Sequence, residues 1–180
     1  MLSYYKTRQL IAKINRNGKV IGQIDKWQTH RKGILHKALT IAIFYKDFLI
    51  IQHRKHPAFD GVFDITSSSH QLFIDGKLQS SSEATYATLK REWNLSKKDI
   101  LYEPLNKGAI YYRAKDTKSE FTEHEMCDIL VTEVKKLPTP NFDFAYGFSL
   151  VKKKEILNKK SRIYQALAPW VKKALEENLL

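Results

Sequence analysis

The segment from Phe121 to Val134 constrains the fold of this chain more than any other stretch. Its run from Ile129 to Val131 is apolar and β-prone, which is typical of a strand that enters a core. Side chains two apart on a strand face the same way, so we expect Glu123 and Glu125 to point together. Burying two neighbouring carboxylates is costly unless a metal ion, a cationic side chain or a shared proton compensates their charge.

Three histidines upstream supply possible co-ligands for a metal: His30, His36 and His70. Imidazole and carboxylate together suit Mn, Zn, Fe and similar divalent ions. The alternative is an exposed sheet face whose two glutamates are neutralised by the many lysines of this chain. The spacing of His30 and His36 is not that of a zinc finger, and a single histidine is more often an ordinary surface or core residue. The metal-site prediction therefore depends on the whole constellation.

The length of 180 residues, of which 43% are apolar, predicts one globular α/β or α+β domain spanning the whole chain, 1–180. The single cysteine, Cys127, excludes an internal disulfide and fits a reducing compartment. The first residues lack the apolar region of a signal peptide, and the longest apolar stretch, 39–45, is too short to span a bilayer. We therefore expect a cytoplasmic protein.

The net charge of +12, from 31 basic and 19 acidic residues, favours a polyanionic partner: nucleic acid, an anionic membrane or a phosphorylated small molecule. The charge is spread along the chain, with groups of lysines at 152–154 and 159–160. No RNP, zinc-finger or helix-turn-helix pattern accompanies it. A small diphosphate needs only a few well-placed cations, so much of this charge can simply solvate the surface, and nucleic acid is a possible partner that the motifs do not favour.

The pattern along the chain predicts one mixed sheet, one central helix and C-terminal helices. Strands are expected at 19–25, 38–45, 48–52, 61–67, 110–114, 121–134 and 146–150. Helices are expected at 83–93, 152–157 and 161–179, the last of them interrupted at Pro169. A serine among 80–82 can cap the central helix and Asn94 can end it. We expect a loop at 71–82 with a turn at Asp75-Gly76, and a linker at 137–140.

Several separated motifs resemble those of the type I isopentenyl-diphosphate isomerases, which have the Nudix fold. They occur in the order of that family, from about Gly18 to the C-terminal helix, at 25–30 with 33–38, 61–70, 110–114, 123–127 and 168–170. The most specific are the Glu-x-Glu-x-Cys strand at 123–127 and the loop that ends in Ser69-His70. The resemblance implies an α+β domain with a mixed central sheet flanked by helices. About 18–150 would form its Nudix core, and 151–180 its C-terminal helices.

The resemblance also implies binding roles. Five residues correspond to the ligands of one divalent ion, Mn, Mg or Zn: His30, His36, His70, Glu123 and Glu125. Glu92 corresponds to a glutamate that helps to bind a second ion, an Mg that accompanies the substrate diphosphate. Lys26 is a candidate diphosphate contact, and Arg54 with Lys55 or His56 lies where the family has basic diphosphate contacts.

The family interconverts isopentenyl diphosphate and dimethylallyl diphosphate by protonating one alkene carbon and deprotonating its neighbour. Such a reaction needs an acid and a base on opposite faces, and a group that stabilises a cation in a dry pocket. By the resemblance, Ser68 and Glu125 correspond to the two acid/base residues of the family, and Tyr112 corresponds to the tyrosine beside the carboxylate. The resemblance gives the cation-stabilising role to Trp170, whose indole face could contribute about 2 kcal/mol. Without the resemblance, Trp170 reads as a core residue of an amphipathic helix.

Two features depart from the pattern of the family. Ser68 stands where the isomerases have a cysteine, and a hydroxyl is a far weaker acid than a thiol, whose pKa is about 8.5. The general Nudix box is also depleted, because only Glu92 remains of its metal-binding glutamates. A pyrophosphohydrolase needs several carboxylates there to hold metals and a water.

Three functions therefore stay open. The first is an isomerase of isopentenyl and dimethylallyl diphosphate that Ser68 slows or redirects. The second is a Nudix pyrophosphohydrolase that acts on a prenyl or nucleoside diphosphate. The third is a non-catalytic protein that binds nucleic acid or a partner protein through its basic surface.

Overall fold

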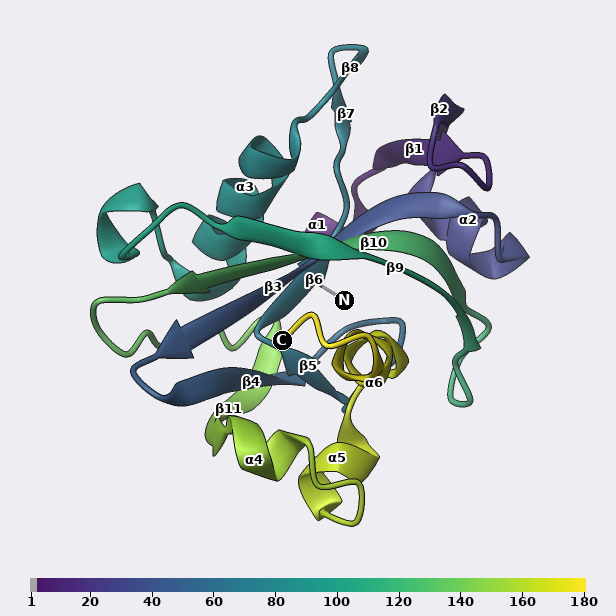
Figure 1. The fold of residues 1–180 in the computed structure, drawn as a ribbon. Helices are drawn as coiled ribbons and strands as arrows, with labels where there is room; N and C mark the ends of the chain where they lie inside the picture. The colour runs from purple at the N-terminus through teal and green to yellow at the C-terminus, as the bar shows by residue number, and fades with distance from the viewer. Residues whose placement is uncertain (1–2) are drawn as a thin grey trace.

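The computed structural model describes residues 3–180, whose strands form one large sheet and one small hairpin, with helices on both faces of the sheet (Figure 1). The elements in chain order are α1 (Ser3–Lys6), β1 (Leu10–Ile14), β2 (Val20–Asp25), α2 (Lys26–Lys32), β3 (His36–Tyr45), β4 (Phe48–Arg54), β5 (Phe63–Ile65), β6 (Ser67–Ser69), β7 (Phe73–Ile74), β8 (Lys77–Leu78), α3 (Ser81–Trp93), the 3-10 turn η1 (Lys97–Asp99), β9 (Leu105–Lys115), β10 (Thr122–Glu133), β11 (Ala145–Lys152), α4 (Lys153–Ile156), α5 (Arg162–Ala166) and α6 (Pro169–Glu176).

The large sheet is mixed, as the sequence predicts. β10 pairs in parallel with β3 and antiparallel with β9, whereas the other pairings are antiparallel. The main path through the sheet is β11-β4-β3-β1-β2, and the short strands β5 and β6 pair with β4 and β3. β3 therefore lies at the centre, where residues from many segments of the chain meet.

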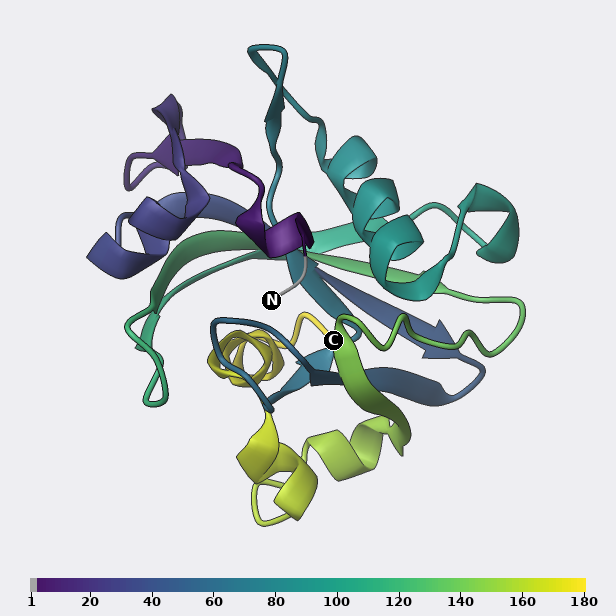
Figure 2. The ribbon, with the colours of Figure 1, turned by 180° about the vertical axis from the view of Figure 1, so that it is seen from behind.

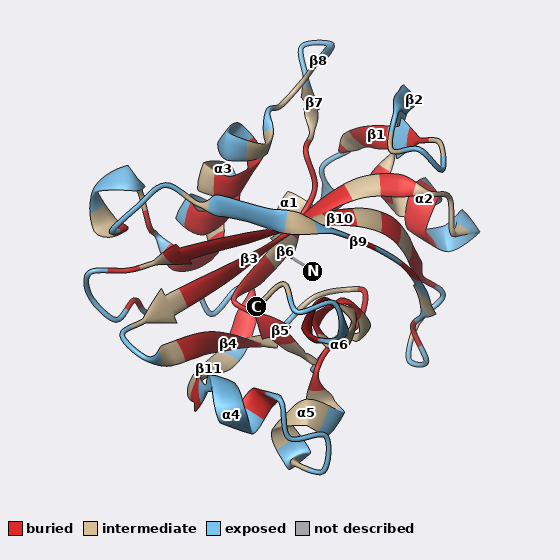
Figure 3. Ribbon diagram, in the orientation of Figure 1, coloured by how far each residue is buried: buried red, intermediate tan, exposed pale blue. Residues whose placement is uncertain are grey.

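The central strand β3 separates two apolar layers, because its side chains alternate between the faces of the sheet. Leu39, Ile41 and Ile43 pack on the face that is covered by α3. Ala38 and Ala42 pack on the opposite face, which is covered by α6. Figure 2 shows the two helices on either side of the sheet, and Figure 3 shows that the strands between them are largely buried. Burial of each large aliphatic side chain contributes about 1.5–3 kcal/mol.

The central helix α3 begins and ends at the signals that the sequence supplies. The Ser80 side chain accepts a hydrogen bond from the backbone N–H of Glu83, and the Glu83 carboxylate accepts one from the Ser80 N–H. This reciprocal pair is a capping box. At the other end Asn94 takes a left-handed conformation with φ +52°, and its N–H bonds back into the last turn. The predicted helix is confirmed.

The C-terminal segment is interrupted at Pro169, as predicted, and forms α5 and α6 instead of one helix. Pro169 is the first residue of α6, where its missing N–H costs no helical hydrogen bond. α6 then buries Trp170, Val171 and Ala174 against the sheet. No helix in residues 3–180 has the length and apolar character needed to cross a membrane.

Several segments differ from the sequence-based expectation. β1 is not predicted, and the strand expected at 61–67 is divided into β5 and β6. Residues 26–32, for which no element is predicted, form the helix α2, which Asp25 caps by accepting a hydrogen bond from the Gln28 N–H. Gly33 ends that helix with φ +57°. The expected loop 71–82 contains the β7–β8 hairpin, which projects from the domain (Figure 1). Its turn is at Asp75-Gly76, as predicted, and positive φ at both residues suits a two-residue hairpin turn.

Candidate metal and diphosphate site

The pairing of β10 places Glu125 between a histidine and a tyrosine. Glu125 lies opposite His36 of β3 on one side and opposite Tyr112 of β9 on the other. The His36 Nε2 is 3.1 Å from the Glu125 Oε1, and the Tyr112 hydroxyl donates a hydrogen bond to the other carboxylate oxygen. Glu123 lies two residues earlier on the same face and is also buried. The expected shared orientation of the two glutamates is therefore present.

Five buried side chains gather their nitrogen or oxygen atoms within 4.8 Å of one another: His30, His36, His70, Glu123 and Glu125. They come from α2, the start of β3, the residue after β6, and β10. The Nε2 atoms of His36 and His70 are 3.1 Å apart, and the His70 Nε2 is 3.2 Å from the Glu125 Oε1. The structure therefore brings together the full ligand set that the sequence analysis singles out.

The orientation of the histidines fits a metal ion. The Nδ1 atoms of His30 and His36 lie 2.6 and 2.8 Å from the carbonyl oxygens of Lys26 and Ile34. Because a carbonyl only accepts, each Nδ1 carries a proton, and in the neutral form of each histidine the Nε2 would offer its lone pair to a metal. A backbone carbonyl behind a ligating histidine is the usual second contact at a metal site.

Two unsatisfied atoms point to the same conclusion. The His30 Nε2 and the Glu123 Oε2 are buried and only 3.0 Å apart, yet neither makes a hydrogen bond among the described residues. Buried polar atoms without partners are rare. An ion with bonds of about 2.1 Å holds opposite ligands about 4.2 Å apart, so small inward movements of these side chains would complete its shell. The residues present therefore fit a divalent ion.

The charges of the cluster are coupled. Burial alone would raise the pKa of Glu125, but the hydrogen bond and charge of His36, with contributions from Glu123 and Tyr112, lower it to about 2. Burial likewise opposes protonation of His36, yet the contacts with Glu125 raise its pKa. Burial and the carboxylates raise the pKa of Tyr112 well above its usual value. Glu125 is thus an anion, and Tyr112 keeps its proton.

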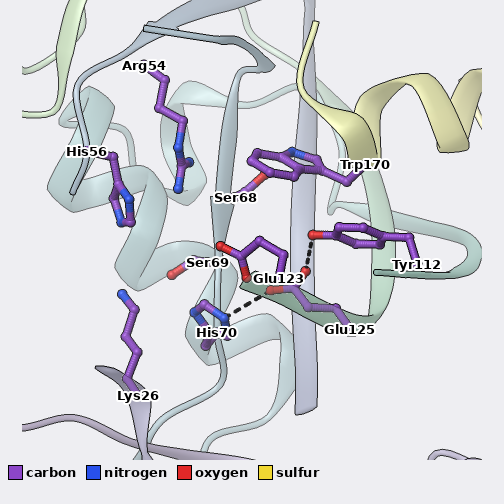
Figure 4. Close-up of a pocket in the computed structure, with 10 residues that line it drawn as sticks. All are labelled: Lys26, Arg54, His56, Ser68, Ser69, His70, Tyr112, Glu123, Glu125 and Trp170. Carbon is purple, nitrogen blue, oxygen red and sulfur yellow. Dashed lines mark hydrogen bonds and ion pairs between the residues drawn. The ribbon is translucent and has the colours of Figure 1, made fainter. Parts of the chain in front are cut away.

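The cluster forms one end of a pocket, and cations form the other end. The residues that line it are Lys26, Arg54, His56, Ser68, Ser69, His70, Tyr112, Glu123, Glu125 and Trp170. Figure 4 shows Lys26, Arg54 and His56 on one side and Tyr112 and Trp170 on the other. The cavity has a volume of about 20 Å³, which is room for about one water molecule.

The cationic end is unusually buried. Lys26 is only 4% exposed, and its ammonium lies 5.0 Å from the ring of Trp27. Burial, followed by repulsion from Arg91 and Arg54, lowers the pKa of Lys26 to about 8. Burial and the same kind of repulsion hold the pKa of His56 well below its usual value. An anionic ligand would relieve this repulsion, so this end of the pocket suits a phosphate group.

The aromatic wall of the pocket consists of Trp170 and Tyr112. Their ring centroids lie 6.1 Å apart with a tilt of 40°, and Phe59 contacts Trp170 edge-on from behind. The indole N–H of Trp170 donates a hydrogen bond to Asp64. Because its N–H is engaged there, the indole is held in place against the pocket, with the Arg54 guanidinium 5.2 Å from the centre of its ring.

Two of the sequence-predicted site residues lie outside this constellation. Lys55 is exposed, donates a hydrogen bond to the Phe142 carbonyl and does not line the pocket. The Glu92 carboxylate is outside the five-residue cluster; it accepts a hydrogen bond from Ser67 at 2.8 Å and pairs with Arg91 at 2.7 Å. A role in binding metal would require Glu92 to exchange these partners.

The sequence analysis misses one residue of the site, Asp64. It is completely buried in β5, behind the pocket wall, and contacts three residues that line the pocket: Arg54, Ser68 and Trp170. Its only signal in the sequence is a carboxylate between the apolar residues Phe63 and Ile65.

No protein-family model and no curated protein matches the chain. Solved structures do match. DR0079 from Deinococcus radiodurans, described as a hypothetical Nudix protein, is 15% identical with a TM-score of 0.64, over 94% of this chain and 96% of that one. The MutT protein from Methanosarcina mazei is 12% identical with a TM-score of 0.60, over 79% of this chain and 91% of that one.

A bifunctional NMN adenylyltransferase/ADP ribose pyrophosphatase from Francisella tularensis is 15% identical with a TM-score of 0.53. The likeness covers 78% of this chain and 41% of that larger one. At these identities the comparisons concern the fold, and the isomerase-type activity stays a prediction. The arrangement of the sheet and helices, together with these likenesses, shows that the chain has the Nudix fold.

Proposed function

We propose that this protein is a metal-dependent enzyme that transfers protons to and from the alkene of a small diphosphate, interconverting isopentenyl and dimethylallyl diphosphate. One observation carries the proposal: a buried His/Glu metal cluster shares Glu125 with Tyr112, beside an indole face, in a pocket whose other end is cationic. Each part meets one requirement of such a reaction.

The five clustered residues would hold one divalent ion, Mn, Mg or Zn. When bound, the ion supplies positive charge that neutralises the two carboxylates. Glu125 keeps one oxygen against His36 and His70 and the other on the hydroxyl of Tyr112. The proton that Tyr112 holds is therefore aimed at Glu125, and this pair can give or take a proton at one face of the substrate.

The rest of the pocket binds the substrate and protects the reaction. Lys26 and Arg54 would contact the diphosphate, and Glu92, once released from Ser67, would help to hold the Mg that accompanies it. Trp170 would stabilise the carbocation-like species with about 2 kcal/mol or more, because the pocket is desolvated. Ser68, which lines the pocket, would be the second acid/base group.

Hydrolysis of a prenyl or nucleoside diphosphate is the second candidate. It is favoured by the likeness in fold to a protein described as an ADP ribose pyrophosphatase. The helix α3 opposes it, because its only carboxylates are Glu83 and Glu92. Glu83 is used in the capping box, and Glu92 is paired with Arg91. A hydrolase needs carboxylates at this place to hold metals and a water.

An NMR time course in D2O, with Mn or Mg and isopentenyl diphosphate, tests the first candidate. The dimethylallyl isomer, or deuterium in recovered substrate, is the expected result. A parallel ³¹P measurement with isopentenyl diphosphate, ADP-ribose and nucleoside diphosphates tests the second. Release of phosphate without isomer or deuterium would replace the proton-transfer proposal with hydrolysis. Intact, unlabelled substrates in both arms would contradict both.

A further inference from the structure

Asp64 accepts hydrogen bonds from three different elements. Its Oδ1 lies 2.8 Å from the indole Nε1 of Trp170 and 3.0 Å from the Ser68 hydroxyl, and its Oδ2 lies 3.1 Å from the Arg54 guanidinium. These donors come from α6, β6 and β4 respectively. Asp64 itself has no exposed surface, so it cannot contact a ligand directly.

All three partners of Asp64 line the pocket (Figure 4). The Arg54 guanidinium also lies 5.2 Å from the centre of the Trp170 ring, so these two partners of Asp64 make a cation–π contact with each other. One buried carboxylate thus fixes the cation-stabilising ring, one of the phosphate-binding cations and the hydroxyl at the second acid/base position. No other described carboxylate contacts this combination of groups.

The charge of Asp64 sets the direction of a chain of hydrogen bonds. A carboxylate only accepts, so the single proton of the Ser68 hydroxyl points toward Asp64 and not into the pocket. The Thr40 hydroxyl, 2.8 Å from Ser68, must then donate to it. Thr40 in turn is 3.3 Å from the Cys127 sulfur, whose thiol also has the Asp128 carbonyl as an acceptor at 3.8 Å. The protons of Ser68 and Thr40 are therefore directed toward Asp64.

Because the Ser68 proton points toward Asp64, the Ser68 oxygen keeps a lone pair that can accept a proton from the pocket. A hydroxyl oxygen has two lone pairs, and Thr40 occupies only one of them. Ser68 is half-buried and lines the cavity, so its second lone pair can receive a proton from a ligand. A serine hydroxyl alone is a poor base, because its oxygen would become positively charged on taking a second proton. That charge does not develop if the hydroxyl gives its own proton to a neighbouring base at the same moment.

We propose that Asp64 is the positioning residue that makes Ser68 competent for proton transfer, an inference that rests on the proposed function. As the Ser68 oxygen takes a proton from a substrate carbon, the O–H bond of Ser68 breaks and its proton passes to the Asp64 carboxylate. Ser68 ends as a neutral hydroxyl and Asp64 as a neutral carboxyl group. In the reverse direction Asp64 returns the proton to Ser68, which protonates the alkene.

The surroundings of Asp64 suit this exchange. Burial raises the pKa of Asp64, while Arg54, Trp170 and Ser68 oppose that rise. Glu92, on α3, adds a smaller contribution that also raises it. Burial therefore makes the carboxylate hold a proton more readily than an exposed aspartate does, while the charge of Arg54 favours its ionised form.

A double-mutant cycle with Asp64→Asn, Ser68→Ala and both together tests the proposal. Rates of isomer formation and of deuterium entry are measured with the metal-loaded enzyme. We expect each single variant to lower kcat by about 100-fold or more while KM changes little, because general acid–base contributions are about 10²–10⁴. The double variant should be no slower than the slower single variant. Asp143→Asn, on an exposed loop, serves as the matched control and should leave kcat unchanged.

Because Asp64→Asn removes the partner of a buried arginine and could unfold the protein, Asp64→Glu is measured as well. It keeps the negative charge opposite Arg54 but displaces the carboxylate by one methylene, so kcat should fall without loss of the fold. The indole N–H resonance of Trp170, assigned by its absence in Trp170→Phe, should shift in this variant. The resonances of Trp27 and Trp93, whose indoles donate elsewhere, should not.

The outcomes separate the two proposals. A wild-type enzyme without exchange or isomerisation would overturn the proposed function and the role of Asp64 with it. An active wild type in which the effects of Asp64→Asn and Ser68→Ala multiply would overturn only the role of Asp64. An Asp64→Glu variant with unchanged kcat or an unshifted Trp170 resonance would also overturn the role of Asp64 alone.

Discussion

At the scale of single residues, Glu125 connects the histidines of the metal cluster with Tyr112. One of its oxygens faces His36 and His70, and the other accepts a hydrogen bond from the Tyr112 hydroxyl. Strand pairing on both sides fixes the carboxylate in this position. A change of this one group should therefore affect metal binding and proton transfer together.

The first prediction concerns Glu125→Gln. The amide keeps the shape of the side chain but removes its negative charge, so the divalent ion should bind at least 10-fold more weakly by calorimetric titration. Proton exchange into the substrate should fall by about 10²-fold or more, since general acid–base contributions have that size. Glu120→Gln is the matched control, because Glu120 is exposed and pairs only with Arg31 on the surface. Unchanged metal affinity in Glu125→Gln would contradict the assigned ligand set.

The second prediction compares two lysines. Lys26 lines the pocket and is almost fully buried, whereas Lys55 is exposed and lies outside it. Lys26→Met should raise KM for the diphosphate by about 10–100-fold, because a hydrogen bond to a charged group contributes about 1.5–3 kcal/mol. Lys55→Met should leave KM within about twofold of the wild type, since exposed ion pairs contribute little. A larger effect from Lys55 would place the diphosphate elsewhere.

The metal cluster can be predicted from the sequence because it depends on two local properties: the alternation of side chains along a strand and the chemistry of each residue type. Glu123 and Glu125 share a face by the period of any strand. Asp64 is missed because its partners are not local: Arg54 is 10 residues away and Trp170 is 106 residues away. Only the sheet, with α6 packed on it, brings these three groups together.

At the scale of elements, the chain shows where local signals decide the structure and where they do not. α3 begins and ends where its capping residues predict. The helix α2 is missed although Asp25 and Gly33 are capping residues of the same kind, because its 7 residues are too few to show a helical period. The β7–β8 hairpin is also missed, since two short strands without a buried face carry almost no periodic pattern.

The third prediction concerns the cap of α3. Ser80→Ala removes the acceptor for the Glu83 N–H, and should lower the free energy of unfolding by about 1 kcal/mol. For a domain of this size the melting temperature should fall by about 2–4 °C. Ser82→Ala, in the exposed first turn of the same helix, should change it much less. Equal effects of the two substitutions would show that the capping box is not formed in solution.

At the scale of the whole molecule, the metal cluster ties separate parts of the chain together. Its ligands come from α2, β3, the segment after β6, and β10, so an ion bound there links elements from 30 to 125 in the sequence. A ligand that binds only the folded state stabilises it by mass action. The net charge of +12 does not connect separate elements in this way, because the basic residues are spread along the chain.

The fourth prediction follows from this link. A divalent ion at about 1,000 times its dissociation constant should add about 4 kcal/mol to the free energy of unfolding. The melting temperature should therefore rise by roughly 8–16 °C over the chelator-treated protein, given about 2–4 °C per kcal/mol. Scanning calorimetry with and without Mn, Zn or Mg measures this rise. A rise of the same size in Glu125→Gln would show that the ion binds elsewhere.

The small volume of the pocket has a kinetic consequence. A cavity of about 20 Å³ cannot receive a diphosphate until the protein rearranges around it. Binding should then proceed through a rarely populated open form, and the observed association rate should level off at high ligand concentration instead of rising linearly. The plateau would report the rate of opening. When the protein closes again around the bound ligand, it would exclude water from that ligand.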